Sequence, residues 1–302
     1  MSKLELKNTA DRFNNTKVKK IINTYQLSFK NGTATGFGDY LRGCFSLYQV
    51  AKILNLEFDM DMNNHPMSKF IASTNSSEKE VKYNEVCRFY NDNYVGIGSK
   101  TYKKKSPQFL GELIKLLNSV DDVEYRLFSN SFPIFDNIRN ESRNFIRSKL
   151  VPNEMMQENI RLRMSRLGLK RKCYSVIHLR CGDSFLLNNH TDKDGISIFE
   201  KVSEFLSKNL NPDSKFLLLS DNNDIKIMLK NKLPQLIVQV REITHLGEQK
   251  NLNDVQVMNT LLDFYTMANS NKIVSFSKFN WGSGFSEWCS VVYNIPYVKI
   301  IV

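Results

Sequence analysis

Short apolar segments alternate along the second half of the chain with longer segments in which apolar residues recur every three or four positions. The short segments predict buried β-strands, and the longer ones predict amphipathic helices. The expected strands cover 174–179, 215–219, 236–240, 272–275 and 297–302, and the expected helices cover 197–209, 224–231, 254–269 and 284–293. This alternation favours an α/β fold with a parallel sheet covered on both faces.

The first half of the chain shows the same alternation in a less regular form. Strands are expected at 25–29, 56–62 and 124–129, helices at 39–54, 136–148 and 153–167, and an irregular polar stretch at 64–110. The change of character near residue 165 predicts two domains, 1–165 and 166–302. A ligand site is expected between them, because domain interfaces often hold such sites.

Composition narrows the class of protein. The chain has 302 residues, of which 41% are hydrophobic, and few Gly or Pro, which excludes a disordered or fibrous chain. No run of about 18 apolar residues occurs, so no membrane span is expected. The segment 1–7 carries no apolar signal region, which predicts a cytoplasmic protein. Five scattered cysteines without a Cys-x-x-Cys pair predict free thiols.

The net charge of +11 is concentrated in basic clusters at 17–20, 103–105 and 161–172. Such clusters indicate solvated helix faces first, and general attraction of anionic ligands second. No aromatic residues interleave with the basic runs and no Cys/His finger occurs, which argues against nucleic-acid binding. A peripheral contact of the clusters with an anionic membrane surface stays open.

The segment 175–183 places a histidine and an arginine at the end of an expected strand. His178, Arg180 and Asp183 follow the apolar residues 176–177, and Gly182 provides a turn. The carboxyl edge of an open α/β sheet is where ligands bind. Because arginine offers a permanent charge and a planar donor fork, Arg180 suits a phosphate. The alternatives are a satisfied core histidine and an Arg180 that is neutralised by Asp183 or Asp221.

A glycine-rich turn precedes the first long helix. Gly36 and Gly38 allow the backbone to approach a ligand, and the helix start offers free N–H groups. The turn is not a dinucleotide fingerprint, because Leu41 stands where its third glycine belongs. The alternative is a tight turn capped by Asp39.

Two further expected strands end in polar residues that would reach the edge where Arg180 lies. Ser220 and Asp221 close the strand at 215–219. Ser283, Gly284 and Ser286 lie where the last helix begins, and their hydroxyl and N–H groups suit phosphate oxygens. A helix-capping role is the competing interpretation for Ser283.

Together these motifs resemble those of the fucosyltransferase superfamily, which includes α1,2-, α1,6- and protein O-fucosyltransferases and the rhizobial chitooligosaccharide fucosyltransferase. The resemblance covers about residues 30–297. It rests on Gly-Phe-Gly-Asp-x-Leu-Arg-Gly at 36–43, His-x-Arg-x-Gly-Asp at 178–183, Ser-Asp at 220–221 and Ser-x-Phe-Ser at 283–286.

The resemblance implies a GT-B fold, in which two Rossmann-like domains face each other across a cleft, with residues 1–165 on the acceptor side and residues 166–302 binding the nucleotide-sugar. It implies an inverting, metal-independent glycosyltransferase that moves fucose from GDP-fucose to a glycan or glycoconjugate and needs no cofactor. In that picture Arg180 and His178 hold the diphosphate, with Ser220 at the same edge, and Asp221 faces guanine. Ser283, Gly284, Phe285 and Ser286 bind phosphate and line the pocket, and Gly36 and Gly38 approach the phosphates.

Two points stay open in this comparison. Cys181 stands where many relatives carry a second arginine, and the catalytic base is Asp183, Asp39 or the loop with Asp192 and Asp194. The Asp-x-Asp triplet at 59–61 mimics a metal-binding motif and is expected to be an ordinary strand end. The alternative functions are a transferase for another nucleotide-sugar, and a non-catalytic basic protein that binds glycan or nucleic acid.

Overall fold

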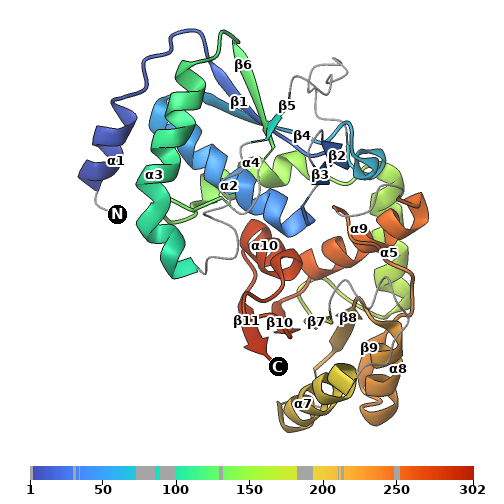
Figure 1. Cartoon of the computed structure of the whole chain (residues 1–302). Coiled ribbons are helices and arrows are strands. Elements are labelled where there is room, and N and C mark those ends of the chain that lie inside the picture. The colour runs from blue at the N-terminus through green and yellow to red at the C-terminus, as the bar shows by residue number, and fades with distance from the viewer. Residues whose placement is uncertain are drawn as a thin grey trace. The chain divides into compact units, whose positions relative to one another are not determined.

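The computed structural model divides into two compact units, each built around its own parallel sheet. It describes residues 3–29, 32–33, 35–72, 86–88, 99–128, 132–181, 193–209, 211, 214–247 and 252–302. The first unit comprises residues 1–68 and 73–151, and the second comprises 69–72 and 152–302. Figure 1 labels the elements of both units. The predicted α/β fold class is confirmed, since helices alternate with parallel strands in each unit.

The first unit has a four-stranded parallel sheet in the order β4-β1-β6-β5. Its strands are β1 (Lys20–Thr24), β4 (Glu57–Asp61), β5 (Val86–Arg88) and β6 (Glu124–Phe128). A short antiparallel hairpin joins β2 (Ser28–Phe29) to β3 (Gly32–Thr33). The helices are α1 (Lys3–Ala10), α2 (Phe37–Leu54), α3 (Ser99–Asn118) and α4 (Asn140–Lys149), and the 3-10 helix η1 (Pro66–Phe70) begins in this unit.

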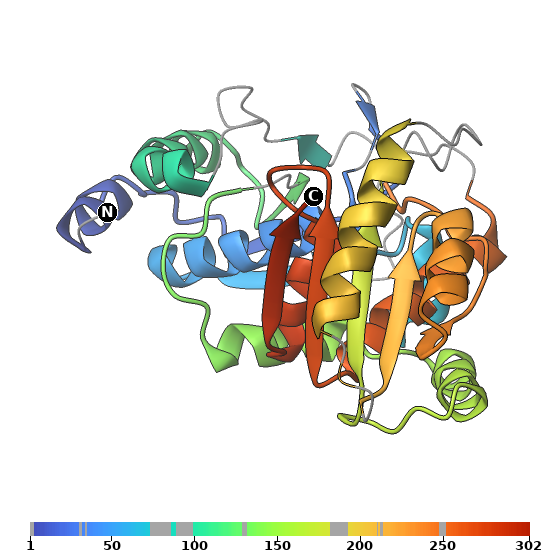
Figure 2. The ribbon, with the colours of Figure 1, turned by 90° about the horizontal axis from the view of Figure 1, so that it is seen from below.

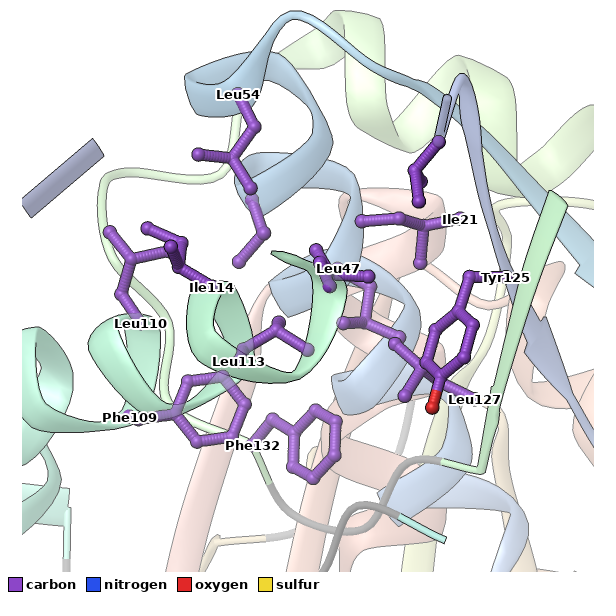
Figure 3. Packing of buried hydrophobic residues seen from close by; sticks show 13 residues of the cluster. Ile21, Leu47, Leu54, Phe109, Leu110, Leu113, Ile114, Tyr125, Leu127 and Phe132 are labelled. Atoms are coloured by element: carbon purple, nitrogen blue, oxygen red, sulfur yellow. The ribbon is translucent and has the colours of Figure 1, made fainter. Parts of the chain in front are cut away.

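The core of the first unit forms where α2 and α3 meet the sheet. Leu47 of α2, Leu113 of α3 and Ile21 of β1 are fully buried in one cluster, and Figure 3 shows their side chains together. Phe109 packs its ring 4.7 Å from that of Phe132. The buried cluster as a whole holds α2 and α3 on the sheet, because burial of such side chains is the main favourable term in folding.

The expected strand at 25–29 is wrong, because the first strand of the sheet is β1 at Lys20–Thr24. Its polar residues hid it from the apolar pattern. Asn23 is buried, and its amide donates to Cys44 Sγ at 3.0 Å and to the Tyr40 carbonyl at 3.4 Å. Tyr25, which follows the strand, stacks on the rings of Tyr40 and His65 instead of extending it.

The expectation of an irregular segment at 64–110 is also wrong at its C-terminal end, where α3 begins at Ser99. The sequence of this helix contains three consecutive lysines and Pro107, and proline predicts a helix boundary. Its second half carries the apolar spacing of a helix, with Phe109, Leu113 and Leu117 buried. The helix α1 was not anticipated either.

The second unit has a five-stranded parallel sheet in the order β11-β10-β7-β8-β9. Its strands are β7 (Ser175–Arg180), β8 (Phe216–Ser220), β9 (Leu236–Val238), β10 (Lys272–Ser277) and β11 (Tyr297–Ile301). Counted along the chain from β7, the strands lie in the order 3-2-1-4-5 across the sheet. This is the strand order of a Rossmann-like half, and it matches the strands expected from the sequence.

Helices cover both faces of the second sheet. The helices are α5 (Glu154–Arg166), α7 (Lys193–Asn209), α8 (Asn223–Lys232), α9 (Asp254–Ala268) and α10 (Gly284–Tyr293). Leu206 of α7 and Leu229 of α8 share one buried cluster with Leu218 of β8. On the other side α9 contacts both α5 and α10, and Cys289 Sγ donates to the Phe264 carbonyl between α10 and α9.

The second unit begins at Pro152, whereas the sequence placed the boundary near residue 165. The reason is α5, which packs on α9 through a buried ion pair between Arg163 and Asp263. Arg163 also donates to Thr266 Oγ1 of α9 at 3.3 Å. The helix therefore belongs to the second unit.

The basic clusters have mixed roles in the structure. Lys17 and Arg161 form exposed ion pairs with Asp121 and Glu158, as expected of solvated faces. Lys172 instead donates from its ammonium group to the carbonyl of Ser270 at 2.8 Å, and Arg163 is buried. The side chains of 103–105 lie outside the described residues. In the described part of the chain, no helix is both long and apolar enough to cross a membrane.

The Asp-x-Asp triplet is held by cations at the end of β4. Asp61 accepts from Arg126 at 2.6 Å in a pair with both side chains nearly buried. Asp59 accepts from Lys149 at 2.7 Å and Lys20 at 3.4 Å. These ion pairs lower the pKa of Asp59, although its burial acts more strongly in the opposite direction than any single one of them. Both carboxylates therefore have structural partners.

We expect Asp61→Asn to lower the free energy of unfolding by about 3–5 kcal/mol, because the change removes one charge from an ion pair whose two side chains are nearly buried. The matched control is Asp121→Asn, which removes the exposed pair with Lys17 and should change stability by less than about 1 kcal/mol. Urea unfolding of both variants measures the difference. Equal effects of the two substitutions would contradict the structural role of the Asp61–Arg126 pair.

Candidate functional site

The candidate site of the second unit lies at the carboxyl edge of its sheet, where the strand order reverses. β7 is flanked by β8 on one side and by β10 on the other. After β7 the chain adds β8 and β9 on one side of it, and then crosses back to add β10 and β11 on the other side. Figure 2 shows the arrowheads of the strands along one edge. In register, His178 lies opposite Ser275 of β10, and Arg180 lies opposite Ser277. Open α/β sheets bind ligands at such a switch point.

Arg180 is positioned by Asp221, the residue that follows β8. The guanidinium donates from one terminal nitrogen to Asp221 Oδ2 at 3.1 Å. The backbone N–H of Cys181 donates to Asp221 Oδ1 at 2.8 Å, so one carboxylate ties down the end of β7 twice. The Arg180 side chain keeps 20% exposure, while that of Asp221 keeps 4%. The guanidinium of Arg180 is therefore partly exposed, and the buried carboxylate of Asp221 fixes its orientation.

Ser220 forms part of the same connection. Its hydroxyl lies 3.5 Å from Asp221 Oδ1 and accepts from the backbone N–H of Asn222 at 3.1 Å. Asn222 then caps α8 by accepting from the Ile225 N–H at 3.0 Å. The buried thiol of Cys181 lies 3.8 Å from the Ser220 hydroxyl, and burial raises its pKa. Ser220 therefore shapes the turn, and Cys181 faces the interior.

His178 joins β7 to the start of α10 through a serine cluster. Its Nδ1 lies 3.1 Å from the Ser286 hydroxyl, which in turn donates to the Ser275 hydroxyl at 3.1 Å. The Tyr297 hydroxyl lies 3.5 Å from the same Ser286 oxygen. The ring of Phe285 lies 6.0 Å from the imidazole. These residues come from β7, β10, α10 and β11, so the cluster fixes the helix start against three strands.

Burial lowers the pKa of His178 to about 4. Nearby Asp221 and Asp263 raise this pKa and Arg180 lowers it, but the removal of the ring from water is the largest effect. The imidazole is therefore neutral at physiological pH. A neutral ring can accept a hydrogen bond on one nitrogen while it donates from the other.

The N-terminus of α10 supplies hydrogen-bond donors beside this cluster. Ser283 is the N-cap residue, yet its hydroxyl makes no capping hydrogen bond to the helix. Its carbonyl accepts from the Ser286 hydroxyl at 3.4 Å and from the Glu287 N–H at 3.0 Å. Gly284 begins the helix, so the first N–H groups and the positive end of the helix dipole lie at this end of α10, an arrangement that suits an anion.

A charged cluster behind the edge was missed by the sequence analysis. Asp263 of α9 is paired with Arg163, and the charges of both residues act on the pKa of Lys226 and of Arg241. Lys226 donates to the Gln239 carbonyl at 3.2 Å, and Arg241 donates to the Asn259 side chain at 3.1 Å. Burial lowers the pKa of both cations, and Asp263 raises it. Three cations around one buried carboxylate leave a positive potential at this edge.

Little in the sequence indicates that cluster. Arg163 stood among the six cations of the run 161–172, and Asp263 stood inside an apolar helix pattern. An acidic residue in the middle of the apolar segment 257–268 was the available indication, because a buried carboxylate needs a cation or hydrogen-bond donors.

The glycine-rich turn of the first unit leads into α2 as expected. Gly36 is the N-cap residue, with φ −58° and ψ 151°, and Gly38 lies buried in the first turn. Asp39 also lies in the first turn and so does not cap the helix as predicted for the alternative. Burial and the charge of Asp39 together raise the pKa of Tyr25, whose hydroxyl donates to the Thr35 carbonyl at 3.0 Å.

Some predicted residues cannot be placed. Asp183 and Asp192 lie outside the described residues, as does the side chain of Asp194 at the start of α7. Of the three proposals for the catalytic base, the structure therefore describes Asp39 alone. Among the described residues, no three His, Cys, Asp or Glu side chains gather in a way that could hold a metal ion.

We expect acidification to destabilise the wild-type protein more than the variant His178→Asn. The pKa of His178 lies below its ordinary value of 6.5, so the unfolded chain takes up the proton first as the pH falls. The associated stability is present above pH 6.5 and is lost as the pH falls toward 4, by roughly 3 kcal/mol. Urea midpoints measured between pH 7 and pH 4.5 test this expectation, and an identical pH slope in the variant would contradict it.

Comparisons by sequence identify no relative of the chain. No protein-family description matches it, and no curated protein matches it. Three-dimensional similarity is the remaining source of evidence on its fold.

Solved fucosyltransferase structures resemble the whole chain. A NodZ α-1,6-fucosyltransferase co-crystallised with GDP has a TM-score of 0.55 at 13% identity, covering 94% of this chain and 96% of its own. The NodZ fucosyltransferase from Bradyrhizobium also has a TM-score of 0.55, at 12% identity, covering 95% and 96%. A mutant of Arabidopsis thaliana FUT1 in complex with GDP has a TM-score of 0.51 at 11% identity, covering 97% of this chain and 73% of its own. The chain therefore has the GT-B-like fold of fucosyltransferases, as its motifs predicted.

Proposed function

We propose that the protein is an inverting, metal-independent glycosyltransferase that transfers fucose from GDP-fucose to a glycan or glycoconjugate acceptor. The observation that carries this proposal is Arg180, held by Asp221 at the switch point of the second sheet and opposite the strand that leads to α10. Solved proteins of the same fold bind GDP. The shared fold favours this chemistry, and the residues at the sheet edge provide the groups that the chemistry needs.

The leaving group is the part of the reaction that these residues suit best. An acceptor hydroxyl oxygen forms the new bond to the anomeric carbon of fucose, and the bond from that carbon to the β-phosphate oxygen breaks. GDP departs with the electron pair and gains negative charge. Arg180 and the N–H groups at the start of α10 are in place before the reaction, so they stabilise this charge without reorganisation.

His178 has a supporting part in this proposal. Because its pKa is about 4, it adds no positive charge at neutral pH. Its hydrogen bond to Ser286 links the strand that carries Arg180 to the helix that would hold phosphate. Phe285 packs beside the ring. His178 would therefore keep the two donor groups at a fixed separation, and its second ring nitrogen is suited to a polar atom of the nucleotide.

The carboxylates around His178 support a guanine nucleotide. Guanine offers two neighbouring donors, the N1–H and the exocyclic amino group, whereas uracil offers one N–H beside two carbonyl groups. Asp221, which the resemblance assigns to guanine, is bound to Arg180 and to the Cys181 N–H. Asp263 is a second carboxylate whose charge acts on His178. We assign guanine recognition to Asp221, as the resemblance implies, because Asp263 is buried and paired with Arg163.

Other cations lie near the sheet edge at which many relatives carry a second arginine. Cys181, at the position where many relatives carry that arginine, is buried against Ser220 and cannot neutralise a phosphate. Lys226 and Arg241 bring positive charge to the neighbouring strand ends. The proton of the acceptor hydroxyl would pass to Asp39, Asp183 or a carboxylate of the 192–194 loop, each of which stays a candidate for the base.

GDP should bind to the purified protein more tightly than UDP. The physical reason is that guanine offers two neighbouring donors, the N1–H and the amino group, to the Asp221 carboxylate, whereas uracil offers one N–H. Isothermal titration calorimetry with both nucleotides in the same buffer measures the difference. Equal or tighter binding of UDP would point to a transferase for another nucleotide-sugar, and no binding of either would favour a non-catalytic protein.

Arg180→Ala should reduce the rate of fucose transfer by about 10²–10³, the usual cost of removing one positioned donor to developing charge. Arg180→Lys keeps the charge and loses the planar fork, so we expect a smaller loss. The control is Arg166→Ala, an exposed arginine of the same unit. Rates measured with GDP-fucose under saturating donor check the order of the three variants. A near-normal rate for Arg180→Ala would remove this residue from the reaction.

Transfer should continue in the presence of EDTA. Arg180 and the N-terminus of α10 neutralise the departing diphosphate, and Asp59 and Asp61 are committed to ion pairs. The assay compares the initial rate before and after chelation, with added Mg²⁺ and Mn²⁺ as the reference condition. A complete loss of activity that either metal restores would show that the transfer depends on a divalent ion.

A further inference from the structure

An exposed aromatic pair lies in the loop between β10 and α10. The side chain of Trp281 is 70% exposed, the largest exposure among the large apolar residues of the described chain. One face of its indole is covered by Phe279, with ring centres 4.9 Å apart and planes 19° from parallel. The other face has no comparable ring contact among the described residues. A tryptophan presented to water in this way requires an explanation, because indole is costly to leave exposed.

The loop that carries the pair is built to hold it still. The Phe279 N–H donates to the Ser277 hydroxyl at 3.1 Å, and the Gly282 N–H closes a turn onto the Phe279 carbonyl at 2.8 Å. Gly282 has a φ of +84°, a conformation that favours glycine. Lys299 of β11 packs its stem against Gly282 and donates to the Trp281 carbonyl at 3.4 Å. The aromatic pair is therefore presented by a pinned turn.

The position of the loop connects it to the proposed donor site. The loop starts at Ser277, which lies opposite Arg180 in the sheet register. It ends at Ser283, the N-cap residue of α10. Both groups that would hold the departing diphosphate therefore flank the loop that carries Trp281. Anything that stacks on Trp281 lies beside the place where the fucosyl group would be released.

The chemistry of the pair fits a sugar ring. A pyranose ring has a face of C–H groups that packs on the electron-rich face of an indole, and tryptophan has the strongest quadrupole of the aromatic residues. The nearby charges are the cations Lys278 and Lys299, with the Lys278 ammonium 5.5 Å from the Phe279 ring centre. These cations disfavour a basic peptide as the occupant.

We propose that Trp281, supported by Phe279, is the stacking platform for a sugar ring of the acceptor glycan. This inference rests on the proposed transferase function, because a platform beside the leaving group is useful when the acceptor must be held against the donor. Burying the exposed face against a C–H surface would recover apolar contact without displacing any hydrogen bond that shapes the loop.

The two tryptophans of the chain permit a direct test. Trp288 is buried in α10, whereas Trp281 is exposed, so acrylamide should quench Trp281 selectively. In the variant Trp288→Phe, Trp281 is the single tryptophan and its quenching reports on the platform alone. Chitotetraose, cellotetraose and maltotetraose serve as probes, with and without GDP. We expect at least one of them to protect Trp281 in a saturable way, and the wild-type protein gives the same readout if the variant is poorly folded.

A substitution series adds a second readout. Trp281→Ala should weaken binding of the protecting glycan, measured by calorimetry, by about tenfold, which corresponds to 1.4 kcal/mol. Phe279→Ala should weaken it less. Val298→Ala is the matched control, because Val298 is an exposed apolar residue of the adjacent β11. GDP affinity should stay unchanged in all three variants.

The outcomes separate this inference from the proposed function. Normal GDP binding without protection by any of the glycans overturns the platform and leaves the transferase proposal intact. Absence of GDP binding contradicts the transferase, and the platform then has no acceptor role. Protection by vesicles of phosphatidylcholine and phosphatidylserine, but not by glycans, would overturn the platform in favour of a membrane contact. Protection that appears only as the protein concentration rises would assign the surface to a second copy of the chain.

Discussion

The carboxylate of Asp221 is the group on which the edge of the second sheet depends. Asp221 follows β8, and its carboxylate accepts from both the Arg180 side chain and the Cys181 backbone N–H. The last residues of β7 therefore cannot move independently of β8. A carboxylate with 4% exposure would be costly without such donors. The same contact gives Arg180 a definite direction while leaving part of its guanidinium accessible. The pair of Asp221 and Arg180 therefore stabilises the edge of the sheet and also orients the accessible part of the guanidinium.

A second layer of interactions joins this edge to the helix that follows β10. The hydroxyl of Ser286 contacts His178, Ser275 and Tyr297, which come from three different strands. Because the hydroxyl can rotate, it can donate to one of these groups while accepting from another. The neutral state of His178 is compatible with this network, whereas an imidazolium would bring a second charge close to Arg180. Burial of the histidine thus keeps the charge at the edge concentrated on the arginine.

The regular part of the fold could be read from the sequence, and the exceptions have physical causes. The strands of the second unit were found because both of their faces are covered by helices, which makes them continuous apolar runs such as 217–219. β1 was missed because its buried polar residue Asn23 donates its side-chain N–H groups to residues of α2, a tertiary contact that no local pattern reveals. α3 was missed because Pro107 interrupts its helical pattern, and packing in its second half overrides that local preference.

The candidate site was predictable to the same extent as its strands. The sequence placed Arg180 and Asp221 at one edge because the strand ends of a parallel sheet meet there, and the structure brings these two side chains within hydrogen-bond distance. The partnership of Arg180 with Asp221 was one of two that the sequence allowed, and the structure contains it, whereas the other candidate, Asp183, lies outside the described residues. The charged cluster around Asp263 could not be assembled from the sequence, because its members come from α5, α8, α9 and the segment after β9. Spacing along the chain carries no information on such a contact.

The close packing of Gly282 against Lys299 has an evolutionary consequence. A Cβ atom at position 282 would lie 2.5 Å from Lys299 Cδ, and the positive φ would strain any other residue there. A shorter side chain at 299 would relieve the clash but not the strain, so the order in which substitutions arise matters. Changes in the β10–α10 loop that keep Gly282 leave the turn itself intact, whereas loss of this glycine requires the turn to be rebuilt. The side chains that the loop presents can therefore change without changing the turn that presents them.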